Sequence, residues 1–142
     1  MQNREGVQSA IVAEVESWLG TPYHHAADVK GVGVDCAMLP LSVFKAIGLI
    51  PADIDPRPYP HDWMLHRGEE RYRAWTERFA DPVNAPEPGD LVLFRVGRCL
   101  AHGGIVVGPD LMIHADLHAG RVERSEIRRW ADKVGGYWRF RA

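Results

Sequence analysis

One thiol and two imidazoles are the side chains whose types and spacing could carry covalent chemistry in this 142-residue chain. Cys36 follows Asp35 at the start of a predicted helix, and His102 and His114 lie on either side of a predicted turn. A helix N-terminus carries a partial positive charge that favours a thiolate, so we expect the pKa of Cys36 to be lowered. One imidazole can then act as base, and the other can fix its tautomer and orientation. The sequence predicts a cysteine nucleophile, with one histidine as base and the other as its orienting partner.

A predicted hairpin brings the two imidazoles together. Gly108-Pro109-Asp110 is a turn signal between two apolar runs. Pairing Val107 with Leu111 across this turn places His102 and His114 on the same face, because side chains alternate along a strand. If His102 is the base, activity should fall as acid protonates it, and a profile flat down to about pH 4 would contradict that role.

Helices are predicted in the first half of the chain. Apolar residues recur at helical spacing over Val7–Leu19, with Gly20 following as a C-cap. Asp35 is a suitable N-cap for a helix from Cys36 to Gly48, in which Pro40 is tolerated only near the start.

The period of the sequence changes along the second half of the chain. Residues 51–60 contain four prolines and predict a loop, and residues 61–79 predict a third helix. From residue 86 onward the apolar period becomes two, which indicates strands. The expected strands are Asp90–Val96, Gly104–Val107, Leu111–Ala115, Arg121–Glu123 and Gly136–Phe140. The pattern predicts an α+β fold with helices first and an antiparallel meander after them.

Composition excludes several classes of protein. The chain is 46% hydrophobic and 25% charged with a net charge of −2, which is typical of one globular domain and not of a nucleic-acid-binding protein. No apolar run approaches the roughly 20 residues of a membrane-spanning helix, and no signal peptide is recognised at the start. The two cysteines form no CxxC motif, and we expect Cys99 to be structural.

Four short motifs together resemble those of the NlpC/p60 cell-wall peptidases, which are papain-like cysteine peptidases. They are Gly20-Thr21-Pro22-Tyr23, Val34-Asp35-Cys36, Pro88-Gly89-Asp90-Leu91-Val92-Leu93-Phe94, and His102-Gly103-Gly104-Ile105 followed by Ile113-His114-Ala115. The resemblance implies a single papain-like domain over residues 1–142, with a central helix bearing the cysteine packed on the sheet and a helical insertion at about 51–84. Among the branches of the family, the chain looks most like the phage-tail and gene-transfer-agent peptidases.

The resemblance also implies roles for individual residues. Cys36 matches the nucleophile, His102 the general base and His114 the polar residue that orients it. Tyr23 matches a tyrosine that assists the oxyanion together with the Cys36 amide. Asp35 matches an acidic residue that helps bind a free peptide amine. His24 and His25, which follow the tyrosine, are expected to line the substrate cleft or lie on the surface.

The implied reaction is hydrolysis of an amide bond in peptidoglycan stem peptides, through a thioester acyl-enzyme and without a metal or cofactor. Family members typically cut the bond between γ-D-glutamate and the diamino acid. Two departures concern that bond. Ala37-Met38 stands where Ser-Gly is usual, and His24-His25-Ala26-Ala27 replaces an Arg-Trp-Gly-Gly run.

Two other functions use the same residues. The chain could be a catalytically degenerate structural or docking component of a tail or hub, or a zinc-binding hydrolase that uses Cys36, His102 and His114 as ligands. The phage-like branch implies a tail or hub protein as partner, with Arg67–Arg78 and Arg121–Arg141 as docking surfaces chosen by charge. It also implies localisation in a phage-like particle, or in the cytoplasm before assembly.

Overall fold

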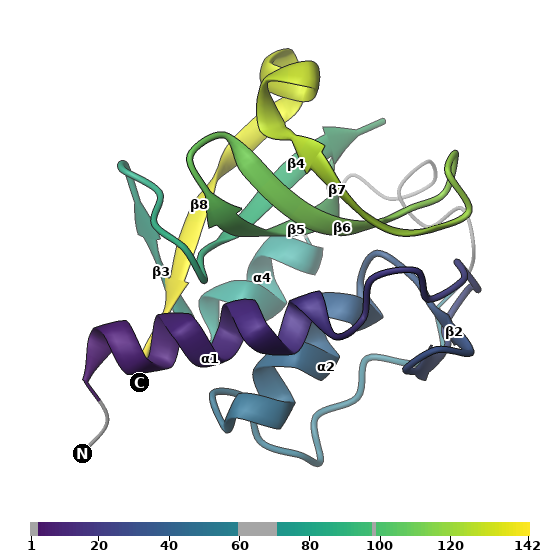
Figure 1. The fold of residues 1–142 in the computed structure, drawn as a ribbon, viewed down its shortest axis with the longest axis horizontal. Coiled ribbons are helices and arrows are strands. Elements are labelled where there is room, and N and C mark those ends of the chain that lie inside the picture. Colours follow the sequence, from purple (N-terminus) through teal and green to yellow (C-terminus); the bar gives the residue numbers. More distant parts are fainter. Residues whose placement is uncertain (1–2, 60–70, 98) are drawn as a thin grey trace.

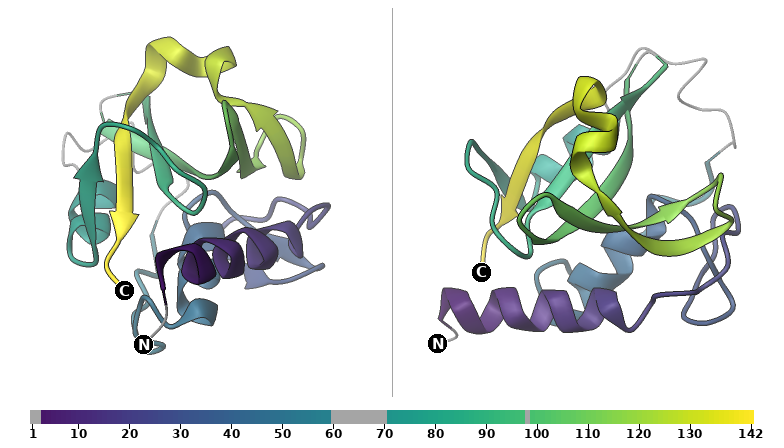
Figure 2. Two further views of the ribbon diagram at one scale, coloured as in Figure 1. Left: turned by 60° about the vertical axis from the view of Figure 1, so that its left-hand side comes forward. Right: turned by 45° about the horizontal axis from the view of Figure 1, so that its top comes forward.

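Two helices lie against one side of an antiparallel sheet in the computed structural model, which describes residues 3–59, 71–97 and 99–142 (Figure 1). The helical elements are α1 (Arg4–Glu16), α2 (Met38–Ile47), α4 (Arg71–Glu77) and the 3-10 helix η1 (Ile127–Lys133). Helices α1 and α2 contact each other beneath the sheet, and both further views show the same layering (Figure 2). No helix among the described residues is long and apolar enough to cross a membrane.

The main sheet has the strand order β3-β8-β4-β5-β6-β7, and every neighbouring pair is antiparallel. Its strands are β3 (Ala80–Val83), β4 (Leu91–Val96), β5 (Cys99–Gly108), β6 (Leu111–Asp116), β7 (Arg121–Glu126) and β8 (Val134–Phe140). Strands β4 to β7 form the predicted meander, whereas β8 returns to lie between β3 and β4. The α+β prediction is confirmed.

Helix α1 begins and ends earlier than its apolar pattern predicts. The Asn3 side chain accepts a hydrogen bond from the Gly6 amide, so the helix begins before Val7. After Glu16 the amides of Trp18 and Leu19 bond three residues back, which tightens the chain into a turn. The predicted apolar stripe is buried and consists of Val7, Ile11, Val15 and Trp18.

Helix α2 begins at Met38, two residues after the predicted start. The N-cap position is therefore Ala37 and not the predicted Asp35, but Asp35 Oδ1 still accepts from the amides of Ala37 and Met38 at 3.1 and 2.8 Å. Pro40 then lies in the first turn, where an amide hydrogen is not needed. Cys36 therefore lies in the turn that precedes the helix.

The histidine hairpin has the predicted register except at its tip. Ile105 pairs with Ile113 and Val106 with Met112, as the prediction requires. At the tip Gly108 instead of Val107 pairs with Leu111, because the register shifts after Val106. The strand β5 also extends back to Cys99, so it includes His102.

Several strands were not predicted. The short pair β1 (Asp28–Val29) and β2 (Gly33–Val34) forms between the first two predicted helices. Strand β3 lies within the predicted helical insertion, where Pro82 is tolerated because β3 is an edge strand. Of the predicted helix over 61–79, the structure shows α4, and residues 61–70 lie outside the described residues.

Candidate active site

Asp35 is a buried carboxylate that joins three segments of the chain around the thiol. It is 2% exposed, and its Oδ1 accepts from the two amides that lead into α2. Its Oδ2 accepts from the Ala26 amide at 2.7 Å and from the Tyr59 hydroxyl. The resemblance assigns this residue to binding a free amine, whereas here both oxygens already accept hydrogen bonds from the chain itself. Asp35 therefore fixes the turn that carries Cys36.

The Cys36 thiol lies against strand β5. Its Sγ donates to the Ala101 carbonyl oxygen at 3.6 Å and accepts from the Tyr23 hydroxyl at 3.8 Å. The Tyr72 hydroxyl, from α4, donates to the Cys36 carbonyl oxygen at 3.0 Å. The Tyr23 hydroxyl thus contacts the thiol, and the Tyr72 hydroxyl holds the backbone of the same residue.

The expected lowering of the thiol pKa is not what the structure supports. Burial, with the Asp35 charge adding to it, raises the pKa of Cys36 to about 12. The helix begins only at Met38, so the positive end of its dipole acts from two residues away, while removal from water acts on the sulfur itself. The resting nucleophile is therefore a neutral thiol.

The two imidazoles form a hydrogen-bonded pair. His102 Nε2 lies 2.8 Å from His114 Nδ1, and His114 Nε2 lies 2.9 Å from the Ser125 hydroxyl. His114 is 2% exposed, and the ring of Trp130 packs edge-on against it. The predicted base and orienting partner are thus in contact, and Ser125 extends the chain by one more polar group.

Burial keeps both imidazoles neutral. Burial first, and then the nearby His114, lower the pKa of His102 to about 3, and burial lowers the pKa of His114 as well. The loss of activity expected from protonation of the base therefore moves from its ordinary pKa of 6.5 to about 3. A profile that is flat down to about pH 4 no longer argues against His102 as the base.

Strand β5 connects the thiol to the histidine pair. Ala101 contacts the sulfur through its carbonyl oxygen, and His102 is the next residue. Within the described part of the chain, no hydrogen bond joins the sulfur to either imidazole. The structure therefore brings Cys36 together with Tyr23, and His102 together with His114. The two pairs meet at consecutive residues of β5, because Ala101 contacts the sulfur and His102 belongs to the histidine pair.

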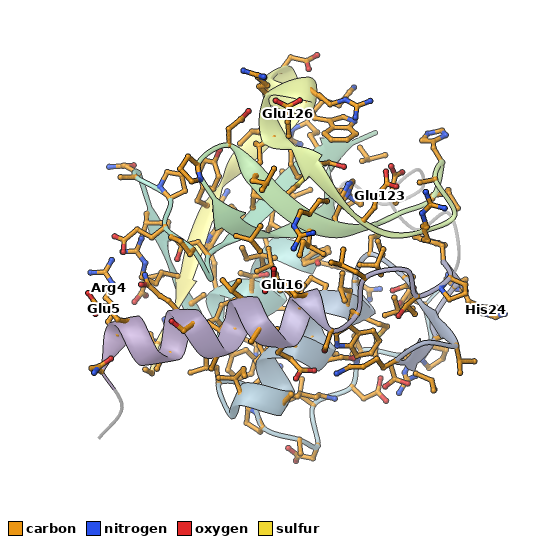
Figure 3. The ribbon with its side chains drawn as sticks, in the orientation of Figure 1. Arg4, Glu5, Glu16, His24, Glu123 and Glu126 are labelled. Atoms are coloured by element: carbon orange, nitrogen blue, oxygen red, sulfur yellow. The ribbon has the colours of Figure 1, made fainter. Side chains whose placement is uncertain are left out.

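The two histidines after Tyr23 differ in their surroundings. His25 Nε2 contacts the Tyr59 carbonyl oxygen at 2.9 Å, and its Nδ1 lies 3.9 Å from Asp35 Oδ2. His24 is exposed and lies at the periphery of the molecule, away from the sheet (Figure 3). His25 thus belongs to the wall around Asp35, whereas His24 is a surface residue.

Sequence reasoning missed three residues of the site. Tyr59 lies in a proline-rich loop, Tyr72 on a short charged helix and Ser125 on the strand β7, which is longer than predicted. Each one acts through a single hydroxyl across a long sequence separation, so no local motif indicates it. Only the alternation along β7 could have placed Ser125 on the face of the histidines.

Ala37, where the family usually has serine, lines an apolar cavity of about 280 Å³. Pro40 and Leu41 of α2 and Tyr72 and Trp75 of α4 also line this cavity. A serine hydroxyl would face mainly apolar side chains there, so alanine suits the environment.

The three residues of the zinc hypothesis do not form a metal-binding group. Among the described residues, no cluster of three or more histidine, cysteine and acidic side chains is arranged to hold a metal ion. His102 Nε2 and His114 Nδ1 are hydrogen-bonded to each other, so the lone pairs of these two nitrogens cannot both point to one ion. This donor geometry does not fit the zinc hypothesis.

A thiol before a helix, packed against a strand with a histidine pair, defines an α+β domain with a cysteine–histidine site. The sequence profile of the NlpC/P60 family matches residues 20–139, and the chain belongs to this family. A Listeria grayi protein described as "Probable endopeptidase p60" is 26% identical over 132 residues, which are 92% of this chain. The chain spans 22% of the length of that protein.

Solved structures show the same fold. The NlpC/p60 domain of the peptidoglycan hydrolase SagA superposes with a TM-score of 0.64 at 20% identity, covering 92% of this chain and 96% of that one. The peptidoglycan hydrolase RipB of Mycobacterium tuberculosis gives a TM-score of 0.64 at 18% identity, covering 99% and 68%. The NlpC/P60 fold predicted from the motifs is confirmed.

Proposed function

We propose that this domain is a cysteine peptidase that hydrolyses an amide bond of peptidoglycan stem peptides. The observation that carries the proposal is the contact of the Cys36 thiol with Ala101 of β5. The next residue of that strand is His102, which is hydrogen-bonded to His114. Family membership supports it, as do the names of the relatives, which describe an endopeptidase and two peptidoglycan hydrolases.

His102 acts as the base through its Nδ1. Its Nε2 is occupied by His114, so Nδ1 is the nitrogen left to accept the thiol proton. The thiol exchanges its bond to the Ala101 carbonyl oxygen for one to this nitrogen as the substrate enters. Apo geometries of this kind commonly tighten only in the substrate complex.

The reaction proceeds in two halves. The sulfur attacks the carbonyl carbon of the substrate while its proton passes to His102, and the amide C–N bond then breaks as His102 returns that proton to the leaving amine. Water, deprotonated by His102, next attacks the thioester carbon and releases the carboxylic acid and the free thiol. Tyr23, whose hydroxyl touches the sulfur, and the Cys36 amide stabilise the negative oxygen formed in both halves.

The bond between γ-D-glutamate and the diamino acid is the substrate bond we propose. The support for it is the resemblance of the motifs around Tyr23 and Cys36. In this chain Asp35 acts on a substrate amine only through its negative charge, because its oxygens already hold four donors.

Mass spectrometry of the fragments released from purified cell-wall sacculi tests this function. We expect the wild-type protein to release fragments whose masses identify the cut amide, and Cys36→Ala to release none. Cys99→Ala, which removes the other thiol of the chain, is the matched control: Cys99 is buried against Ala101, Tyr59 and Tyr72 beside the site, and replacing it should leave the fragment masses unchanged. Unchanged turnover in Cys36→Ala would exclude the peptidase, and absence of turnover in the wild type would favour the docking component.

We further propose that the protein works as part of a phage-like particle and opens the wall locally, docked to a tail or hub protein. Exposed arginines within residues 71–78 and from β7 onward support a charged docking surface, namely Arg71, Arg73, Arg78, Arg121, Arg124, Arg128, Arg129 and Arg141. Residues 67–70 of the first predicted surface lie outside the described residues. Proteomic analysis of purified particles should detect this chain, and its consistent absence from them would contradict the localisation.

A further inference from the structure

Ser125 lies at the inner end of the histidine pair. It is 5% exposed on β7, and its hydroxyl is 2.9 Å from His114 Nε2. The strands β6 and β7 pair His114 with Glu123 and Met112 with Ser125, so the serine lies one step along from the imidazole on the neighbouring strand. A polar side chain in this position can decide which nitrogen of His114 carries the hydrogen.

The direction of the hydrogen bonds decides whether His102 can act as a base. His102 can accept the thiol proton on Nδ1 only if the single ring hydrogen of His102 is on Nε2. That hydrogen is then donated to His114 Nδ1. His114 must then carry its own hydrogen on Nε2, which needs an acceptor. In the reverse direction His102 carries its hydrogen on Nδ1 and has no lone pair for the thiol.

We propose, on the basis of the peptidase function above, that Ser125 is a positioning residue whose hydroxyl accepts from His114 Nε2 and so holds both imidazoles in the catalytic tautomers. Protonation of His102 during the reaction leaves this direction unchanged, because the imidazolium still donates from Nε2. The relay is therefore Cys36, His102, His114 and Ser125 throughout turnover.

Among the described residues, His114 Nε2 makes no hydrogen bond besides the one to Ser125. The charge of Asp116 on β6 favours a protonated His114 and that of Arg129 on η1 opposes it, and both act through space. Trp130 contacts the ring edge-on with centroids 5.3 Å apart. Without Ser125, a hydrogen on Nε2 would be buried without a partner, so the unproductive tautomer would be favoured.

Nitrogen NMR of the imidazoles in the resting protein, combined with steady-state kinetics, tests the relay. We expect Ser125→Ala to move the hydrogen of His114 from Nε2 to Nδ1 and to lower kcat by about 10- to 100-fold with KM nearly unchanged. Ser125→Thr retains a hydroxyl and should restore both the tautomers and most of kcat. Val122→Ala, on the same strand but packed in the main core, should lower stability without changing either readout.

The outcomes separate this inference from the peptidase proposal. Unchanged tautomers and kcat in folded Ser125→Ala would overturn the relay while leaving the peptidase intact. A tautomer shift in Ser125→Ala, in a protein whose wild type cuts no stem peptide, would support the relay and overturn the peptidase. Equal losses in the alanine and threonine variants, with wild-type tautomers in both, would reduce Ser125 to a packing role and overturn the inference.

Discussion

At the residue scale, the site combines a neutral thiol with neutral imidazoles. Burial raises the pKa of Cys36 and lowers the pKa of His102, so both charged forms are disfavoured before substrate binds. The thiol proton must therefore leave during attack on the substrate and not beforehand. This differs from a site in which a thiolate and an imidazolium are already formed at rest.

The reactivity of the thiol toward iodoacetamide should reveal this state. In a Cys99→Ala background, Cys36 should be alkylated at neutral pH on the order of 10³-fold more slowly than a free cysteine, because its pKa is about 12 instead of the ordinary ~8.5. The rate should rise about tenfold with each pH unit through the alkaline range. Fast alkylation at neutral pH, with no further rise above about pH 8, would show a lowered pKa instead.

The sequence predicted the reactive residues but not their electrostatics. Cys36, His102 and His114 stand in motifs whose types and spacing indicate their chemistry. The predicted direction of the Cys36 pKa shift was wrong, because the shift depends on removal of the thiol from water and on the Asp35 charge in the folded chain, which no local pattern states. Ser125 was missed for the same reason.

At the element scale, strand β5 is the part that both groups share. It contacts the thiol through Ala101, carries His102, and approaches the Tyr72 ring at Gly103. A Cβ at Gly103 would lie 2.3 Å from the Tyr72 hydroxyl oxygen and 2.9 Å from its ring carbon. Only a residue without a side chain allows this strand to lie so near α4.

Gly103→Ala should therefore damage activity by moving Tyr72 away from the Cys36 carbonyl oxygen. We expect kcat to fall by about tenfold or more, because the turn carrying the thiol loses a buried hydrogen bond of about 1–3 kcal/mol. Gly108→Ala is the matched control on the same strand, since its nearest neighbour would lie at an ordinary 4.0 Å. Equal activity of the two variants would show that the hydrogen bond from Tyr72 to Cys36 does not contribute to kcat.

The elements were predicted where one periodic pattern decides them. The apolar stripe of α1 and the register of the β5–β6 hairpin follow from residue order alone. Strand β3 was missed because Ala80–Val83 has no alternating pattern and pairs with β8, which lies more than fifty residues away along the chain. Its pairing is a property of the whole sheet.

At the scale of the whole molecule, the sheet is packed on α1 and α2 and held at its borders by ion pairs. Phe44 of α2 stacks on Phe140 of β8, with ring centroids 3.8 Å apart. Glu16 of α1, labelled in Figure 3, pairs with Arg124 of β7 at 2.6 Å. These contacts keep the thiol and the histidine pair on fixed elements.

The stability of the folded chain should decrease in mild acid because folding lowers the pKa of the half-buried His102 and of the buried His114. Unfolding returns His102 from a pKa of about 3 to 6.5, so between these values the unfolded chain binds more protons. The contribution of His102 to the free energy of unfolding is fully present above pH 6.5. It decreases toward pH 3 by up to about 1.4 kcal/mol per pH unit. Asp55, a solvent-exposed carboxylate whose pKa is lowered to about 2 by its hydrogen bonds to Arg57, adds a smaller loss below its ordinary 3.8, because solvent screens this pair.

Urea denaturation between about pH 7 and about pH 4 measures this slope. His102→Gln keeps a donor toward His114 but does not titrate, so its free energy of unfolding should depend less steeply on pH. A wild-type slope equal to that of the glutamine variant would show that His102 titrates normally in the folded protein.

The insertion of β8 between β3 and β4 has a consequence for synthesis. Strands β4 to β7 can pair as each leaves the ribosome, because short turns connect them. The other edge of β4 has no partner strand until β8 (Val134–Phe140) has also been synthesised. During that interval a newly made chain exposes an apolar strand to other nascent chains, and docking of β8 ends the exposure.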